Sequence, residues 1–174
     1  GDYRLPITLD YHSAGVKVEE MAGWVGLGWS FNAGGVITRS VRGLDDLDTN
    51  FGYDKITDTE RQNLATAGSY TTQNNVLSNL QDVVAGNLDT QLDLFYYNFG
   101  NESGKFVMRN GVGNAMPKNN MSIKFYNSPS RFEVITGDGT KYIFSTREDT
   151  YTGNGNNNQT FISSWYLTSI TYPN

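Results

Sequence analysis

Short runs of alternating apolar and polar residues recur along this chain, separated by residues that favour turns. The first run spans residues 3–12, where Leu5, Ile7 and Leu9 alternate with polar neighbours. A period of two places successive side chains on opposite faces of an extended strand, whereas a surface helix repeats every three to four residues. The pattern therefore predicts a domain built mainly from half-buried strands.

Two turn signals organise the later runs. Asp138-Gly139 separates two alternating segments and predicts a tight hairpin. Pro173 ends the last strand, because proline cannot donate a ladder hydrogen bond. The remaining Asn- and Gly-rich stretches, 110–120 and 152–159, are expected to be loops. Further strands are predicted at 16–18, 36–42, 92–99, 105–109, 121–126, 131–136, 140–145 and 161–172.

Composition supports a β-rich fold and excludes several classes of protein. Aromatic residues make up 13 % of the 174 residues and charged residues only 18 %, which argues against both a coiled coil and a disordered chain. The net charge of −5, without a run of Lys or Arg, argues against nucleic-acid binding. With no cysteine and one histidine, His12, disulfides, thiol catalysis and two-histidine metal sites are excluded. No apolar stretch approaches the length of a membrane span.

Residues 57–86 depart from the strand pattern. Thr57 and Glu60 have the spacing of a capping box, and apolar residues from Val76 to Val84 follow helical spacing up to Gly86. We therefore expect two short helices inserted into a single all-β domain covering 1–174. Its sheet should be mainly antiparallel and twisted, with a sandwich-like or shell-like shape.

The segment around the first two tryptophans should supply much of the core. Val25, Leu27, Trp29 and Phe31 share one strand face, while Trp24 lies on the other face with Gly26 and Gly28, where a ring or a backbone can approach closely. Residues 32–35 are expected to form a turn. The predicted core anchors are Trp24, Trp29, Phe31 and Trp165.

No motif specifies catalysis. Gly26 and Gly28 lack the strand–loop–helix context of a phosphate-binding loop, and His12 beside Ser13 lacks an orienting acid. A pair of carboxylates could serve glycoside hydrolysis, but nothing singles out two of them. The carboxylates considered are Asp10, Glu19, Glu20, Asp93, Glu133 and Asp138.

Residues 45–58 are expected to form an acidic loop. A cofactor is not expected, although this loop leaves one metal alternative open. Asp46, Asp48 and Asn50 alternate as oxygen ligands do in a calcium loop. Phe51 and Thr57 occupy the positions where an EF-hand requires Gly and Glu. A solvated loop is the preferred interpretation, and a looser calcium site is the alternative.

Exposed aromatic residues offer an alternative function, since sugar faces stack on aromatic rings. Adjacent aromatic pairs occur at Tyr96-Tyr97 and Trp165-Tyr166. Alternation places one member of each pair on each face of its strand, so about half of these rings should be buried. The candidate ligand platform consists of Tyr96, Tyr97 and Tyr166.

Several blocks of this sequence resemble the opening of long bacterial Rhs/YD-repeat proteins, including the start of the B component of insecticidal toxin complexes. The most specific block is Gly26-Leu-Gly-Trp-Ser30, and residues 44–90 match least well. The blocks that carry the resemblance are 5–15, 24–39, 41–43, 93–100, 103–106, 138–144 and 164–170.

The resemblance implies a secreted or bacterial cell-surface protein, related to toxins in some members, whose repeats wind strands into a hollow shell. The chain ends at Tyr172-Pro-Asn174, in what reads as the first half of a turn, so we expect a fragment of a longer chain. We predict a non-enzymatic structural module that starts or caps this shell. Its partners would be the downstream repeats of the same chain, joined through the edge of strand 161–172. A surface adhesion or glycan-binding module, with a cell-surface glycan or protein as partner, is the alternative.

Overall fold

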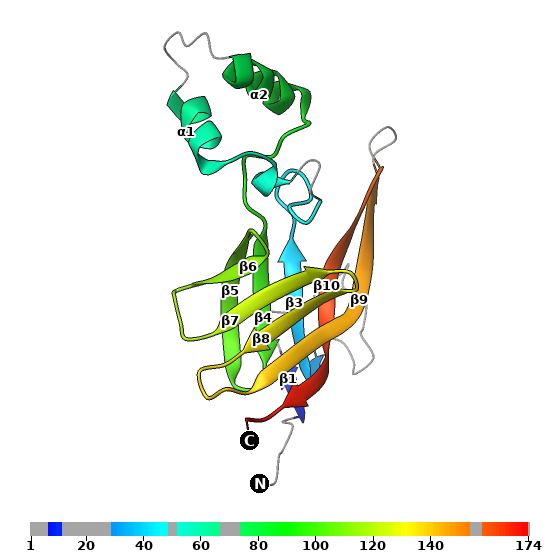
Figure 1. Ribbon diagram of the computed structural model, residues 1–174. Coiled ribbons are helices and arrows are strands. Elements are labelled where there is room, and N and C mark those ends of the chain that lie inside the picture. Colours follow the sequence, from blue (N-terminus) through cyan, green and yellow to red (C-terminus); the bar gives the residue numbers. More distant parts are fainter. Residues whose placement is uncertain (1–6, 12–28, 49–51, 67–73, 154–157, 174) are drawn as a thin grey trace.

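The computed structural model describes residues 7–11, 29–48, 52–66, 74–153 and 158–173. Within these residues, eight strands form a closed antiparallel barrel, and two helices project from one end of it (Figure 1). The predicted fold class, mainly β with a small helical insertion, is confirmed. The barrel strands are β3 (Gly35–Ser40), β4 (Leu94–Phe99), β5 (Glu102–Arg109), β6 (Val112–Met116), β7 (Ser122–Asn127), β8 (Ser130–Ile135), β9 (Lys141–Gly153) and β10 (Asn158–Thr171).

The barrel is an up-and-down meander in which each strand pairs with the next along the chain. Closure comes from β10, which also pairs with β3 through Ser164–Tyr166. Because the sheet closes on itself, the expected sandwich or shell takes the form of a barrel, and most of the strand edges are paired. The β3–β4, β5–β6, β7–β8 and β9–β10 connections lie at the end that carries the helices. The other three lie at the opposite end (Figure 1).

The barrel interior is filled with aromatic rings. Phe95, Phe106 and Phe132 have no exposed surface, and neighbouring rings pack with centroids 5.0 Å apart for Phe95–Phe106 and 5.7 Å apart for Phe106–Phe132. Offset and edge-on contacts of this kind are the favoured arrangements for aromatic pairs. An eight-stranded barrel has an interior just wide enough for side chains to fill. The other buried members of this core are Ile37, Tyr97, Phe99, Met108, Ile123, Val134, Phe144 and Trp165.

One predicted loop is a strand. Residues 110–120 were expected to be irregular, but Val112–Met116 forms β6 and pairs with β5. Asn110 and Gly111 both have positive φ, at 50° and 75°. Positive φ at both central residues is the signature of a two-residue type I′ hairpin, for which Asn-Gly is a preferred sequence. The prediction of a loop was wrong, because Asn110-Gly111 forms the turn of a hairpin and the chain pairs again from Val112.

The helical insertion lies between β3 and β4, as predicted. It contains α1 (Asp58–Thr66) and α2 (Asn74–Ala85), and the short 3₁₀ turn Tyr53–Lys55 precedes it. The capping box is confirmed, since Glu60 N donates to Thr57 Oγ1 at 3.2 Å and Thr57 N donates to Glu60 Oε2 at 2.8 Å. Gly86, at φ 74°, ends α2. Neither helix has the length and hydropathy needed to cross a membrane.

A second, two-stranded sheet precedes the barrel. It pairs β1 (Ile7–Tyr11) with β2 (Trp29–Ala33), and Leu9 faces Phe31 in the antiparallel register. The turn expected at 32–35 is absent, because Asn32 and Ala33 continue β2 and only Gly34, at φ 102°, breaks the strand before β3. The short strand expected at 16–18 lies outside the described residues.

The β9–β10 hairpin is longer than the barrel wall. β8 pairs with β9 only over Lys141–Phe144, so β9 from Ser145 onward and the first part of β10 extend as a two-stranded ribbon (Figure 1). The predicted loop 152–159 is shorter than expected, since β9 continues to Gly153 and β10 begins at Asn158.

Candidate functional site: the neck between barrel and helices

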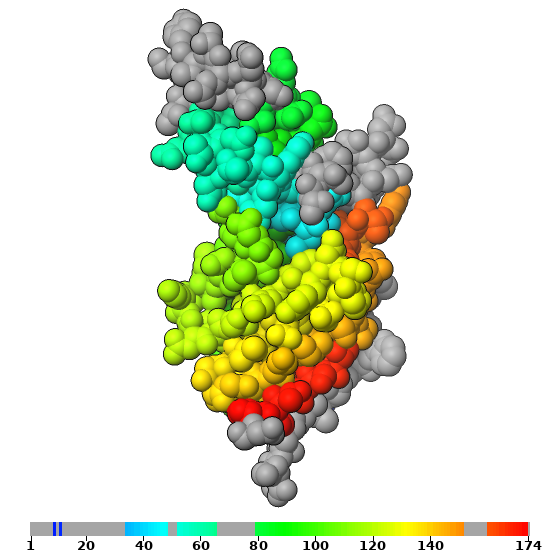
Figure 2. Space-filling model, in the orientation of Figure 1, coloured from blue at the N-terminus to red at the C-terminus, as the bar shows by residue number. Residues whose placement is uncertain are grey.

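The candidate site is the neck, defined as residues 39–48 and 52–54 together with residues 88–93. Here the chain leaves β3 for the helices and returns to β4. Figure 2 shows the helical part projecting beyond the barrel body from this level. Most of the acidic loop expected at 45–58 lies in the neck. Three of its carboxylates, those of Asp45, Asp46 and Asp54, accept hydrogen bonds from donors within the protein, so its described part is an organised element.

A buried ion pair forms the centre of the neck. The side chains of Arg39 and Asp93 have no exposed surface, and Arg39 Nε and Nη2 donate to Asp93 Oδ2 at 2.9 and 2.5 Å. Arg39 Nη2 also donates to Asp45 Oδ1. Two nearby carboxylates offset much of the cost of burying the guanidinium, whose Nη1 has no partner among the described residues. Arg39 also lies 5.6 Å from the centroid of the Phe95 ring, so the neck is continuous with the barrel core.

Asp46 and Asp93 hold their two segments together through reciprocal bonds. Asp46 N donates to Asp93 Oδ2 at 3.1 Å, and Asp93 N donates to Asp46 Oδ2 at 2.6 Å. Their other oxygens accept from Tyr53 N at 2.8 Å and from Arg42 N at 2.6 Å, respectively. Each carboxylate thus accepts hydrogen bonds from backbone N–H groups that are not paired in a sheet or a helix.

Asp89 also holds the two segments of the neck together by accepting hydrogen bonds from backbone N–H groups. Its Oδ2 accepts from Leu44 N at 2.8 Å, and its Oδ1 accepts from Gln91 N at 2.9 Å. A Cβ at Gly43 would lie 2.8 Å from Asp89 Oδ1, and Gly43 has φ 82°. Glycine is therefore required at this position both by its backbone conformation and by the close approach of the carboxylate.

Burial and mutual repulsion shift the carboxylate pKa values. Burial, with the neighbouring charges of Asp93 and Asp89, raises the pKa of Asp46 to about 6, although backbone donors oppose the shift. Burial also raises the pKa of Asp93, against the opposing effect of Arg39. The neck therefore holds a carboxyl group that titrates near neutral pH.

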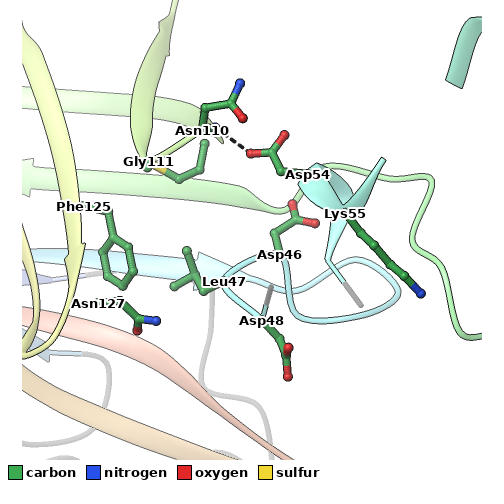
Figure 3. Close-up of a pocket in the computed structure, with 10 residues that line it drawn as sticks. Asp46, Leu47, Asp48, Asp54, Lys55, Asn110, Gly111, Phe125 and Asn127 are labelled. Atoms are coloured by element: carbon green, nitrogen blue, oxygen red, sulfur yellow. Dashed lines mark hydrogen bonds between the residues drawn. The ribbon is translucent and has the colours of Figure 1, made fainter. Parts of the chain in front are cut away.

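A cavity of about 360 Å³ lies beside the neck (Figure 3). Phe125 and Asn127 line one side of it, the aspartates line the other, and Leu47 lies between them. Asp54 is fixed at the rim, since Arg109 Nε and Asn110 N donate to its carboxylate at 2.9 and 2.6 Å. A second cavity of about 320 Å³ shares Leu47 and Phe125 and reaches Arg39.

The geometry favours a structural role for these carboxylates over acid–base chemistry. A raised carboxyl pKa beside a cavity is a common mark of an active site. However, both oxygens of Asp46 accept backbone N–H groups, so neither is directed at a substrate. Among the described residues, no three acidic or histidine side chains are arranged to hold a metal ion. Asn50, the third residue of the calcium alternative, lies outside them.

The carboxylates considered for glycoside hydrolysis are scattered. Asp93 is in the neck, Glu133 is on β8 and Asp138 is in the β8–β9 turn at the opposite end of the barrel. Asp138 serves that turn, since its carboxylate accepts from Thr136 Oγ1 at 2.5 Å and from Thr140 N at 3.1 Å, and these bonds lower its pKa. Asp10 lies in β1. The other residues considered for a site lie outside the described residues: the carboxylates Glu19 and Glu20, the pair His12 and Ser13, and the glycines Gly26 and Gly28.

The predicted aromatic anchors fall in different places. Trp165 lies in the barrel core with no exposed surface. Trp29 and Phe31 lie in β2, and the structure does not describe their side-chain surroundings. Trp24 lies outside the described residues.

One of the three tyrosines predicted as a ligand platform is misplaced. Tyr97 is only 7 % exposed and belongs to the core, and its hydroxyl accepts from Asn119 Nδ2 at 3.1 Å, so the prediction was wrong for this residue. Tyr96 and Tyr166 lie on the outer face, 45 % and 43 % exposed. They occupy β4 and β10, the two strands that flank β3.

The buried Arg39 was not predicted, although the sequence carries a signal for it. Arg39 shares strand parity with Ile37, so period-two alternation directs it toward the core. A charged residue on the inward face of a strand requires a buried partner. The sequence does not identify that partner as Asp93, 54 residues away.

The raised pKa of Asp46 predicts that the domain becomes more stable on mild acidification. A carboxyl with a native pKa of about 6, against 3.8 when unfolded, contributes stability that is complete below pH 3.8 and is lost as the pH rises past 6. We expect the urea midpoint to rise between pH 7.5 and pH 5. Asp46→Asn should flatten this rise, whereas Asp149→Asn, on the exposed ribbon, should retain it. A midpoint that falls on acidification would contradict the burial of Asp46.

No protein-family profile, curated protein or solved structure matches this chain at a significant level. The Rhs/YD-repeat resemblance therefore remains a prediction from the residues that carry it.

Proposed function

We propose that this domain is a non-enzymatic structural module that starts or caps a YD-repeat β-shell in a secreted or surface protein, related to toxins as the resemblance suggests. Its partners would be the downstream repeats of the same chain. The observation that best supports the proposal is the β9–β10 ribbon, which offers strand edges outside an otherwise closed barrel.

The ribbon edges are open over most of their length among the described residues. β10 pairs with β3 only over Ser164–Tyr166, so the edge predicted for 161–172 is occupied at its centre. The mechanism of strand addition is therefore limited to the rest of the hairpin. Residues 149–153 pair with 158–162, and the segments 145–153 and 158–163 present their outer edges to a further strand.

Charged side chains would restrict which strands can join. Arg147 and Asp149 are both exposed on the ribbon, and their side chains lie 3.5 Å apart. Charged residues on an edge discourage pairing between identical copies. We infer that the ribbon is suited to a specific neighbouring strand with polar, complementary side chains, as the next hairpin of the same chain would provide.

The test compares this chain with one extended by the residues that follow it in its natural polypeptide. Amide exchange at the outer edges of 145–153 and 158–163 should slow in the longer chain, and the thermal transition should rise. Amides of β4 provide the internal control, since this strand is already paired with β3 on one side and β5 on the other. Equal exchange and equal melting in the two chains would contradict the proposal.

A glycan-binding module remains the second candidate, and a specific contact favours it. Tyr166 Oη donates to Glu148 Oε2 at 3.0 Å, which places an exposed ring beside a carboxylate. This bond is the main reason that the pKa of Tyr166 is raised. Rings with adjacent hydrogen-bond acceptors suit sugars, which have apolar faces and hydroxyl rims. Loss of sugar binding in Tyr166→Ala, with unchanged melting, would support this candidate.

A further inference from the structure

The end of the barrel opposite the helices contains a cavity of about 440 Å³. The meander brings three connections together there, namely β4–β5, β6–β7 and β8–β9, and each contributes lining residues. Small-molecule sites commonly form at the mouths of β-barrels and have volumes of about 300–1,000 Å³. The position and size of this cavity are therefore those of a binding site.

Amide and carboxylate groups dominate the lining. Neither Lys nor Arg lines the cavity, so an anionic ligand would meet two carboxylates without a compensating charge. Tyr142 and Met121 add apolar surface, and Tyr142 is held by its ring contact with Phe99, at 4.6 Å between centroids. The polar lining residues used below are Asn101, Glu102, Asn119, Asn120 and Asp138.

Part of this lining is fixed by internal hydrogen bonds. Asn119 Nδ2 donates to Tyr97 Oη at 3.1 Å, and Asn119 Oδ1 accepts from Met121 N at 3.2 Å. Asp138 Oδ2 accepts from Thr140 Oγ1 at 3.0 Å. These contacts hold two walls of the cavity in place before any ligand arrives, which lowers the entropic cost of binding.

Other lining groups remain available. The side chains of Asn101, Glu102 and Asn120 are exposed, and the structure gives them no side-chain hydrogen bond within its described part. Two amides and one carboxylate supply both donors and acceptors. Adjacent hydroxyl groups, which donate and accept at once, match such a set better than a purely anionic or purely cationic ligand does.

We propose that this cavity binds a neutral carbohydrate, with Glu102 and the amides of Asn101 and Asn120 bonding its hydroxyls and Tyr142 contacting an apolar ring face. The site is distinct from the Tyr96 and Tyr166 surface, which lies on the barrel wall. No described residue of the β9–β10 ribbon lines this cavity. The site can therefore exist whether or not the domain starts or caps a shell.

The test is a titration of the ¹⁵N-labelled chain with neutral mono- and disaccharides, namely glucose, galactose, mannose, N-acetylglucosamine and their β-1,4-linked dimers. We expect at least one of them to give saturable shifts at 101–102, 119–121 and 136–138. Asn120→Ala and Glu102→Ala should each weaken binding at least tenfold without changing the melting temperature, because both side chains are exposed. Asn101→Ala provides a second probe of the same wall if either variant fails to fold.

Tyr166→Ala is the matched control, since it removes an exposed side chain on a different surface and should leave this affinity unchanged. Glucuronate, as the anionic arm, should bind more weakly than glucose, and glucosamine, as the cationic arm, should not be the only sugar that binds. The proposal is overturned if no neutral sugar shifts these resonances at millimolar concentration. It is also overturned if Tyr166→Ala abolishes binding while Asn120→Ala does not, or if only the cationic sugar binds.

Discussion

Replacing Trp165 with alanine is expected to lower the free energy of unfolding by about 3–5 kcal/mol, the usual cost of truncating a large buried aromatic side chain. Trp165 has no exposed surface, and its ring lies 4.9 Å from that of Phe132 and 6.0 Å from that of Phe125, both edge-on. Its Nε1 donates to Ser130 Oγ at 3.0 Å. The substitution would remove packing, aromatic contacts and one hydrogen bond together.

The position of Trp165 in the closing strand adds to the expected effect. Trp165 pairs with Ile37 of β3, in the three-residue ladder that closes the barrel. A cavity beside so short a ladder should weaken closure as well as the core. Urea denaturation followed by circular dichroism measures the change, and it avoids reliance on tryptophan fluorescence in a tryptophan variant.

The adjacent residue supplies a matched control for this experiment. Tyr166 belongs to the same strand but lies on the outer face, 43 % exposed. Tyr166→Ala should therefore cost less than about 1 kcal/mol, in line with a surface substitution. If the two variants unfold at the same urea concentration, Trp165 does not anchor the core.

Local signals in the sequence predicted most of the individual elements. Alternation located β4, β8 and β10, and it correctly predicted that each aromatic pair is divided between the two faces; the structure places Trp165 and Tyr97 inside. The capping box and Gly86 bounded the helices because caps depend on residues three or four positions apart. Such interactions can be read from spacing alone.

The closure of the barrel could not be read in the same way. β3 and β10 are joined by only three residue pairs, and Ile37 pairs with Trp165 from the far end of the chain. Strand pairing at this separation is decided by how the whole sheet twists and curls, which no local pattern records. Alternation also left open which tyrosine of Tyr96-Tyr97 faces inward, and that choice depends on the register with β3 and β5.

In the neck, too, the ion pairs and hydrogen bonds join residues far apart in the sequence, so local patterns do not predict them. Asp45, Asp46 and Asp48 were read as a solvated acidic loop or a loose calcium site, because the sequence offers no view of their donors. Asp46 instead bonds backbone groups of Tyr53 and Asp93, the latter 47 residues away. A short run of acidic residues is interpreted as solvent-exposed when the hydrogen-bond donors that contact it are unknown. Here those partners are backbone amides and one buried arginine.

Replacing Asp93 with asparagine is expected to destabilise the domain by about 3–5 kcal/mol, because it leaves the Arg39 charge buried without its main partner. The substitution keeps the size of the side chain, so the loss reflects charge and hydrogen bonding. Asp93 accepts from Arg39, from Arg42 N and from Asp46 N. An amide nitrogen in place of either oxygen would face at least one of these donors.

A double-mutant cycle separates the ion pair from the backbone bonds. Arg39→Met removes the buried charge and keeps an unbranched apolar stem beside Phe95. Combined with Asp93→Asn, it should cost less than the sum of the two single changes, since neither charge is then left unpaired. Simple additivity would mean that the two side chains do not stabilise each other.

The exposed ribbon provides the reference for an ordinary surface pair. Arg147 and Asp149 lie 3.5 Å apart with side chains 53 % and 45 % exposed, so Arg147→Met should cost less than about 1 kcal/mol. A cost for Asp93→Asn no larger than this would show that the neck is not a stabilising junction. A much larger cost would mean that the buried Arg39–Asp93 pair contributes far more to the free energy of unfolding than an exposed ion pair does.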